Sequence, residues 1–293
     1  MTDKKEVWTI GKILDWTKQY FKDKGVESPR LDAEVLLSHI VKCDRIHLYV
    51  NFDRPLMADE LAVYRQAVKM RAQRIPVAYI LGEKEFMGHT FRVTQDVLIP
   101  RPDTEILVEE AIRLLADKPS PRIVDIGTGS GAIILSVLLD VEGATGVAVD
   151  LSEKALAVAQ SNGERLGVGE RVTFRHGNLY APIAGEKYDM IMSNPPYIPV
   201  CDMETLSPEV HKEPKMALVG GTDGLDFYRR LIDGAPTLLN EDGVVLFEVG
   251  IHQAHQVARL GKERGFTETR ILNDYAGIER VVVLGGYGKA VEE

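Results

Sequence analysis

One short segment of the chain combines a side-chain amide, prolyl carbonyls and an aromatic ring. It consists of Asn194, Pro195, Pro196 and Tyr197. They follow the apolar segment 188–193, which is predicted to be a buried strand. Proline fixes φ and has no N–H for a strand ladder, so the strand must end there in a stiff polar corner. Ligands of open α/β sheets bind where strands end in this way. The corner is suited to grip a planar amide or amine, and it indicates a methyl-transfer site.

The residue types of this corner fit catalysis on a planar nitrogen. Such a nitrogen is a poor nucleophile because its lone pair is delocalised. The Asn194 side-chain oxygen and the Pro195 carbonyl can accept its two N–H groups, which orients the nitrogen and favours positive charge on it. Tyr197 can cover a flat substrate face, and Pro196 stiffens the turn. The alternative is a proline-rich strand terminator with Tyr197 packed in the core.

A second motif, in residues 123–134, predicts a strand, a glycine-rich turn and the start of a helix. The glycines allow a close approach of the backbone to a ligand, and the helix start adds unpaired N–H groups. The predicted cofactor-binding residues of this turn are Gly127, Thr128, Gly129, Ser130 and Gly131. Asp150 ends the next strand, 23 residues after Gly127 (150 − 127), where a carboxylate can accept ribose hydroxyls.

The glycine turn alone does not identify its ligand, because it also satisfies the dinucleotide fingerprint. Two details favour S-adenosylmethionine. Asp125, just before the glycines, would attract the cationic amino-acid part of that cofactor and repel a pyrophosphate. The corner at residues 194–197 is not required by a dehydrogenase. A dehydrogenase, or a tight turn without a ligand, remains open from these residues alone.

The surrounding elements must hold these two motifs together. Residues 6–75 are predicted to be helical, with helices near Ile10, over Leu31–Val41 and over Ala58–Arg74. Turn chemistry between short alternating runs predicts a β-hairpin at residues 86–93. We expect a helical domain at residues 1–76, a β-hairpin linker at residues 77–98 and an α/β domain at residues 99–293. Asp103 or Thr104 can cap the helix that opens the α/β domain.

Strands and helices alternate after residue 119, which predicts a mostly parallel sheet with helices on both faces. Seven strands are expected, at residues 122–126, 146–150, 172–175, 190–193, 244–249, 269–272 and 280–284. Helices are expected at residues 132–139, 153–166, 225–239 and 253–264.

Composition limits the partners and the compartment. The chain has 293 residues, 45% hydrophobic and 27% charged, and no apolar run near the ~20 residues of a membrane span. The formal net charge of −9 argues against a surface that neutralises many phosphates. Only Cys43 and Cys201 occur, far apart, so a disulfide framework or a cysteine zinc site is not expected. A reducing cytoplasm fits best.

The chain resembles the HemK/PrmC-type peptide chain release factor glutamine N5-methyltransferases over nearly its whole length. The supporting motifs are residues 98–105, 125–131, 194–197, 214–218, 220–228 and 247–250. The helical N-terminal region followed by a hairpin also matches. The resemblance implies a class I (Rossmann-like) S-adenosylmethionine-dependent methyltransferase domain with a seven-stranded sheet.

This resemblance also implies a substrate and residue roles. The substrate would be the glutamine of the Gly-Gly-Gln motif of class 1 release factors, and the product of the cofactor would be S-adenosylhomocysteine. By this resemblance, the cofactor contacts are residues 127–131, Asp150 and Asn194. The substrate clamp, which holds the glutamine, is formed by residues 194–197. Leu179 stands where an aromatic residue often covers the adenine, and would give an apolar wall. Residues 1–76 would dock the substrate protein.

Several alternatives remain at this point. An adenine-N6 methyltransferase acting on DNA or RNA would use the same corner, although the acidic charge balance argues against it and no direct nucleic-acid partner or membrane partner is expected. A module that binds the cofactor and docks release factors without catalysis is a third candidate. Phe91 could line the glutamine pocket or the hairpin core equally well. Glu248, His252 and His255 have metal-like spacing, but Gly250 breaks the helical register, so no metal is expected.

Overall fold

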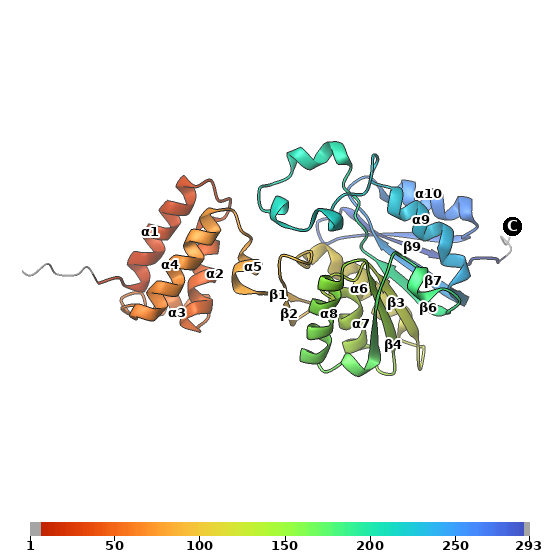
Figure 1. The fold of residues 1–293 in the computed structure, drawn as a ribbon, viewed down its shortest axis with the longest axis horizontal. Coiled ribbons are helices and arrows are strands. Elements are labelled where there is room, and N and C mark those ends of the chain that lie inside the picture. Colours follow the sequence, from red (N-terminus) through yellow and green to blue (C-terminus); the bar gives the residue numbers. More distant parts are fainter. Residues whose placement is uncertain (1–6, 290–293) are drawn as a thin grey trace, which may run out of the picture. The chain divides into compact units, whose positions relative to one another are not determined.

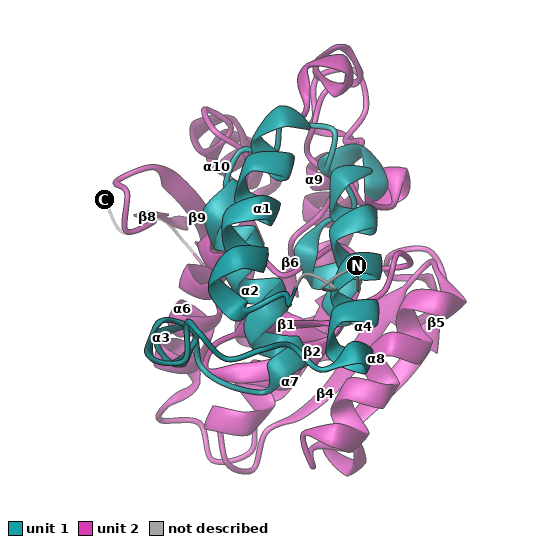
Figure 2. Ribbon diagram, turned by 90° about the vertical axis from the view of Figure 1, so that its left-hand side faces the viewer, with its two compact units in different colours: residues 1–82, 207–212 teal, residues 83–206, 213–293 magenta. Residues whose placement is uncertain are grey.

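The computed structural model describes residues 7–289 as two compact units, coloured separately in Figure 2. Unit 1 comprises residues 1–82 and 207–212, and unit 2 comprises residues 83–206 and 213–293. The first six and last four residues of these spans lie outside the described residues. Within residues 7–289, no helix combines the length and the apolar character that crossing a bilayer requires.

Unit 1 is a small helical bundle. Its helices are α1 (Ile10–Asp23), α2 (Pro29–Val41), α3 (Arg45–Val50), α4 (Ala58–Ala72) and α5 (Val77–Leu81). Their apolar faces form one core that includes the fully buried Phe21, Leu37 and Tyr64. The segment 207–212 belongs to this unit because Glu209 accepts hydrogen bonds from Arg71 and Arg74, each at 2.7 Å.

The β-hairpin is shorter than the expected 77–98 segment. It consists of β1 (Glu83–Phe86) and β2 (His89–Arg92), paired antiparallel. Residues 77–81 form helix α5 instead. Pro76 precedes this helix, and Gly82 ends it in the left-handed conformation at φ 76°, which glycine adopts without the cost of a Cβ clash.

Unit 2 contains the seven-stranded sheet with the order β5-β4-β3-β6-β7-β9-β8, of which Figure 1 labels β3, β4, β6, β7 and β9. The strands are β3 (Arg122–Ile126), β4 (Thr145–Asp150), β5 (Val172–His176), β6 (Tyr188–Ser193), β7 (Leu239–Glu248), β8 (Glu268–Asn273) and β9 (Glu279–Gly285). The helices are α6 (Glu105–Leu115), α7 (Ala132–Asp140), α8 (Glu153–Arg165), α9 (Asp226–Gly234) and α10 (Ala254–Arg264). β9 runs antiparallel to β7 and β8, and the other neighbours are parallel. The expected fold class is confirmed.

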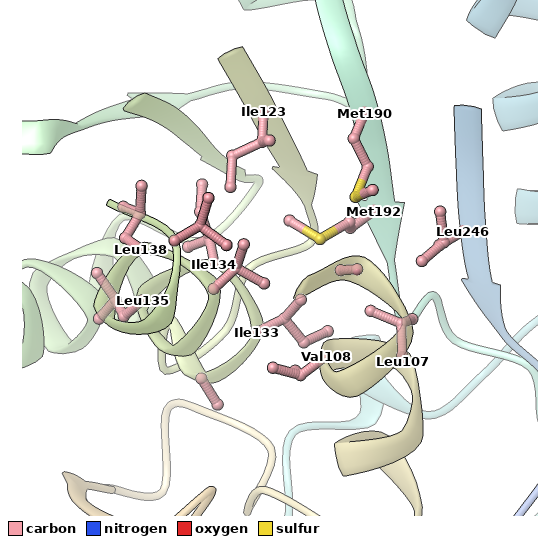
Figure 3. Packing of buried hydrophobic residues seen from close by; sticks show 14 of the residues in the cluster. Leu107, Val108, Ile123, Ile133, Ile134, Leu135, Leu138, Met190, Met192 and Leu246 are labelled. Carbon is pink, nitrogen blue, oxygen red and sulfur yellow. The ribbon is translucent and has the colours of Figure 1, made fainter. Parts of the chain in front are cut away.

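Both faces of the sheet are buried, as alternate residues of one strand show. Met190 and Met192 of β6 pack in the cluster with α6 and α7, which Figure 3 shows from close by. Ile191, between them, packs in the opposite cluster with α9 and α10. Because side chains alternate along a strand, two apolar layers require an apolar residue at almost every position. This explains the continuous apolar runs of the sequence.

One expected helix ends early. Residues 225–239 were expected to be a single helix, but α9 ends at Gly234 and a 3-10 turn (η7, Ala235–Thr237) follows. Pro236 in this turn lacks the N–H that an α-helix needs. The chain is then free to enter β7 at Leu239, five residues before the expected start at residue 244 (244 − 239).

Candidate active site

A cavity of about 280 Å³ lies at the carboxyl ends of β3, β4 and β6. The strand order changes direction here, since β4 and β5 lie on one side of β3 and β6 and β7 on the other. Such a switch point leaves a crevice between the two connections that diverge from it. Its walls include the glycine turn, Asp150 and the corner at residues 194–196. The two motifs, far apart in the sequence, therefore line one cavity.

The glycine turn leaves its backbone open to the cavity. Gly127 and Gly129 have φ values of 77° and 56°. In the described part of the chain, no atom lies within 4 Å of where a Cβ would stand on either residue. Gly131, at φ 81°, is the residue before α7. A ligand can therefore approach this backbone closely, next to the positive end of a helix.

Two carboxylates support the turn. Asp150 Oδ2 accepts the N–H of Gly129 at 2.9 Å, and its Oδ1 accepts the N–H of Ser152 at 2.8 Å. Asp125 does not line the cavity; its Oδ2 accepts a hydrogen bond from Thr128 Oγ1 at 2.7 Å. Burial raises the pKa of both carboxyls, that of Asp125 to about 7. A positive charge nearby would lower both pKa values and favour the ionised form of the carboxyls.

Hydrogen bonds connect the glycine turn and the corner to each other and to the neighbouring loops. Ser193 Oγ donates to the Ile126 carbonyl at 2.6 Å, which connects the ends of β6 and β3. Asn162 Nδ2 donates to the Ser130 carbonyl at 2.8 Å. After the corner, the N–H of Ile198 donates to the Leu218 carbonyl and that of Gly220 to the Ile198 carbonyl, each at 2.9 Å. The corner is thus held from several sides.

Known proteins resemble this chain at full length. A release factor glutamine methyltransferase of Geobacter sulfurreducens is 48% identical over 283 residues, which cover 96% of this chain and 98% of the relative. The enzyme with the same description from Rhodopirellula baltica is 39% identical over 282 residues, covering 94% and 95%. The PrmC N-terminal domain family matches residues 12–82, and the methyltransferase small domain family matches residues 103–207.

The chain belongs to the release factor glutamine methyltransferase family. It is therefore an enzyme, as expected, and its methyl donor is S-adenosylmethionine.

Solved structures agree on the fold of this family member. The hMettl16 catalytic domain in complex with an RNA hairpin matches with a TM-score of 0.56 and 15% identity, over 82% of this chain and 87% of that chain. A methyltransferase from Pyrococcus furiosus matches with a TM-score of 0.54 and 16% identity, over 79% and 100%. Both are crystal structures, and at this identity they support the Rossmann-like architecture alone.

The residues present fit the methyl donor of the family. The open backbone at Gly127 and Gly129 can accept its amino-acid part, and Asp150 lines the cavity with acceptor oxygens. The buried Asp125 Oδ1 has no hydrogen-bond partner among the described residues. A buried carboxylate with one oxygen free of hydrogen bonds favours a cationic ligand nearby. Leu179 lines the cavity as an apolar wall.

The structure places Tyr197 outside the cavity and locates residues whose roles were left open. Tyr197 does not line the cavity; its ring packs beside Gly250 and the core cluster that contains α9 and α10. Phe91 is fully buried against Phe86 in the hairpin core, with ring centroids 6.0 Å apart, and also does not line the cavity. His255 Nε2 lies 3.0 Å from Glu279 Oε1, so His255 pairs with Glu279 and not with Glu248. Residues 7–289 contain no group of three His, Cys, Asp or Glu residues arranged to hold a metal.

Local sequence patterns did not reveal the partners of three residues in this region, Arg101, Glu213 and Thr104. Arg101 lines the cavity and forms an ion pair with the buried Glu213, which also accepts the Ile99 N–H at 3.0 Å. Thr104 does not cap the following helix, contrary to expectation; its Oγ1 accepts from Asn194 Nδ2 at 3.3 Å. The positions of these residues depend on contacts 90 or more residues apart in the chain, so no local pattern could have indicated them.

Proposed function

We propose that this chain transfers a methyl group to the side-chain nitrogen of the glutamine in the Gly-Gly-Gln motif of class 1 peptide chain release factors. The observation that carries this proposal is the single cavity lined by the glycine turn, Asp150 and Asn194. Such a cavity holds a methyl donor and a planar nitrogen next to each other. Family membership supports the release factor as the substrate.

The proposed roles follow the geometry. Residues 127–131, Asp150 and Leu179 would hold the cofactor, which supplies a methyl group on a positively charged sulfur and becomes S-adenosylhomocysteine. Asn194 Oδ1 and the Pro195 carbonyl would accept the two N–H groups of the glutamine amide. These hydrogen bonds orient the nitrogen and strengthen as positive charge develops on it. The substrate nitrogen would accept the methyl group in exchange for the methyl–sulfur bond, and the methylated nitrogen would then lose one proton to water.

Pro196 and Tyr197 would act as the stiff support of this clamp. Pro196 lines the cavity. Tyr197 is held by its carbonyl, which accepts from Gln253 Nε2 at 3.0 Å. Burial raises the pKa of Tyr197 to about 12, so the phenol stays neutral at physiological pH. We propose that Tyr197 stabilises the corner through packing.

A methylation assay tests the proposed substrate. Incubation with S-adenosylmethionine carrying a labelled methyl group is expected to label a class 1 release factor on one glutamine. A release factor with Gly-Gly-Ala in place of Gly-Gly-Gln is the control and should take up no label. Label on DNA or RNA instead would favour adenine-N6 methylation, and label on neither would favour a module that only binds. We propose no direct nucleic-acid or membrane partner, and a cytoplasmic location, which the two free cysteines support.

We also propose that unit 1 docks the release factor outside its Gly-Gly-Gln loop. Ile46 and Val50, one turn apart on α3, are 74% and 72% exposed. Tyr49 and Phe52, also exposed, stack with ring centroids 6.4 Å apart. An apolar patch of this kind is typical of a protein-binding surface. The relatives of this chain are described as release factor glutamine methyltransferases, which supports a protein substrate as the partner of this surface.

Substitution of the α3 patch tests this docking role. Ile46→Asp is expected to lower kcat/KM for the full release factor by about tenfold, because a charge opposes burial of the patch. The rate with a short Gly-Gly-Gln peptide, which lacks the rest of the release factor, should stay unchanged. Equal loss with both substrates, or no loss with either, would contradict docking at α3.

A further inference from the structure

A buried polar cluster lies behind Asn194. β6 and β7 pair in parallel with Ser193 opposite Phe247, so the next residues, Asn194 and Glu248, are neighbours. Glu248 is 1% exposed. Thr104 is 4% exposed and ends the 3-10 turn η1 (Pro102–Thr104). Strand pairing and the turn before α6 therefore bring three polar side chains together.

Hydrogen bonds connect the members of this cluster. Asn194 Nδ2 donates to Thr104 Oγ1 at 3.3 Å. Hydrogen bonding by the Thr104 and Asn194 side chains lowers the pKa of the Glu248 carboxyl. Among the described residues, Glu248 Oε2 has no hydrogen-bond partner. A buried carboxyl of this kind is costly for stability, and its place directly behind the proposed catalytic amide calls for a functional reason.

The donors and acceptors of this cluster determine the orientation of the amide. An ionised carboxylate only accepts hydrogen bonds. The single hydroxyl hydrogen of Thr104 is therefore used toward Glu248, and the Thr104 oxygen accepts from the Asn194 NH₂ group. This arrangement leaves Asn194 Oδ1 as the end of the amide available to the cavity. An acceptor is what the N–H groups of a glutamine substrate require.

We propose that Glu248 and Thr104 are positioning residues that fix which end of the Asn194 amide faces the substrate. This inference rests on the proposed function, because only a substrate nitrogen that donates hydrogen bonds needs the oxygen end. Neither residue is required to touch the substrate nitrogen. Their effect reaches it through Asn194.

The protonation state of Glu248 controls this orientation. Burial raises its pKa to about 7, and nearby Asp103 raises it further while Arg280 lowers it. Arg280 also pairs with Asp103 at 3.0 Å and with Asp274 at 3.1 Å, so its charge is shared. Tyr197 and Tyr228 face the same carboxyl, and the pKa of each is raised, so both are neutral. Glu248 is thus a group beside Asn194 that changes charge close to neutral pH.

A neutral Glu248 changes the direction of the hydrogen bonds. Its carboxyl proton can be donated to Thr104 Oγ1, which frees the Thr104 hydroxyl hydrogen for Asn194 Oδ1. The amide then turns its NH₂ group toward the cavity, where it opposes the N–H groups of the substrate. Because the carboxyl is protonated below its pKa, turnover should fall as the pH decreases through about 7.

The Thr104 hydroxyl provides the first test, in the full-length enzyme with a release factor. Thr104→Val keeps the volume and removes the hydroxyl, and we expect kcat to fall about tenfold with little change in KM. Thr104→Ser keeps the hydroxyl and should restore most of the turnover. Ser136→Ala, which removes a buried hydroxyl on α7 away from the cavity, is the control and should retain wild-type turnover. Wild-type kcat in Thr104→Val, or equal loss in the valine and serine variants, would overturn the proposal.

The pH profile provides the second test. Glu248→Gln preserves the shape of the side chain but cannot ionise. We expect wild-type kcat to fall from about pH 8 to about pH 6, and the variant to show a lower kcat, by about tenfold at pH 8, with no such fall. The same pH dependence in both proteins, or a flat wild-type profile, would overturn the role of Glu248. Failure of the proposed function is distinguishable, because the wild-type enzyme would then not label the release factor at any pH.

Discussion

Asn194→Ala is expected to lower kcat for release factor methylation by about 10²- to 10³-fold. The amide oxygen is the proposed acceptor for a substrate N–H, and this hydrogen bond strengthens as the nitrogen becomes positive. The proposed cofactor-binding residues are 127–131 and Asp150, which line the cavity and which the substitution does not touch. The dissociation constant of the cofactor, measured by calorimetry, should therefore change only a few-fold.

The matched control is Asn240→Ala. Asn240 is exposed, donates to Asp189 at 3.1 Å and does not line the cavity. This variant should methylate at the wild-type rate. If Asn194→Ala also turned over at the wild-type rate, Asn194 would have no part in the mechanism. A loss of cofactor affinity as large as the loss in kcat would move its role from substrate to cofactor.

Gly220→Ala is expected to lower kcat about 100-fold, although Gly220 is not a proposed catalytic residue. A Cβ there would lie 2.6 Å from the Pro196 carbonyl oxygen and 2.7 Å from the Tyr197 Cα. These are backbone atoms, so they cannot rotate away as a flexible side chain would. The corner must shift, and a misplacement of about 1 Å in the groups that orient a substrate can cost about 10²-fold in rate. The melting temperature should also fall, since the change is within a packed region.

Gly163→Ala is the matched control for a glycine substitution in the same unit. Gly163 lies in α8, where the nearest atoms to a Cβ are 3.4 to 3.5 Å away, an ordinary contact. Alanine favours a helix by up to about 1 kcal/mol over glycine. Wild-type turnover with equal or higher thermal stability is expected. Wild-type turnover in Gly220→Ala as well would show that the corner tolerates displacement, contrary to its role as a rigid clamp.

Most elements of unit 2 were predictable from local patterns. The strand at Arg122–Ile126 has the expected bounds, and β4, β5, β6, β8 and β9 end within two residues of expectation. Strands buried on both faces must be apolar throughout, which makes them visible in the sequence. The main differences arise at Pro236, which ends a helix early, and in the short helices α3 and α5. A helix of five or six residues has too few turns to show a periodic pattern.

The candidate site was predictable where residues adjacent in the chain act together. Two segments have a backbone conformation that their own residue types determine, the turn at residues 127–131 and the corner at residues 194–197. Glycine allows positive φ in the first, and proline ends the strand in the second. Family resemblance then supplied the chemistry. Tyr197, in contrast, lies outside the cavity that its neighbours line, since the backbone turn directs its ring toward Gly250.

The sequence by itself therefore determined the fold class, the two motifs and the family of this chain. Each of these depends on the order of residues within a short segment or on the similarity of the whole chain to a known family. Only the tertiary structure decided which side chains stand behind Asn194. Thr104 and Glu248 lie 90 and 54 residues away from it in the chain (194 − 104 and 248 − 194). They meet it because β6 pairs with β7 in one register and the turn before α6 reaches the same edge of the sheet.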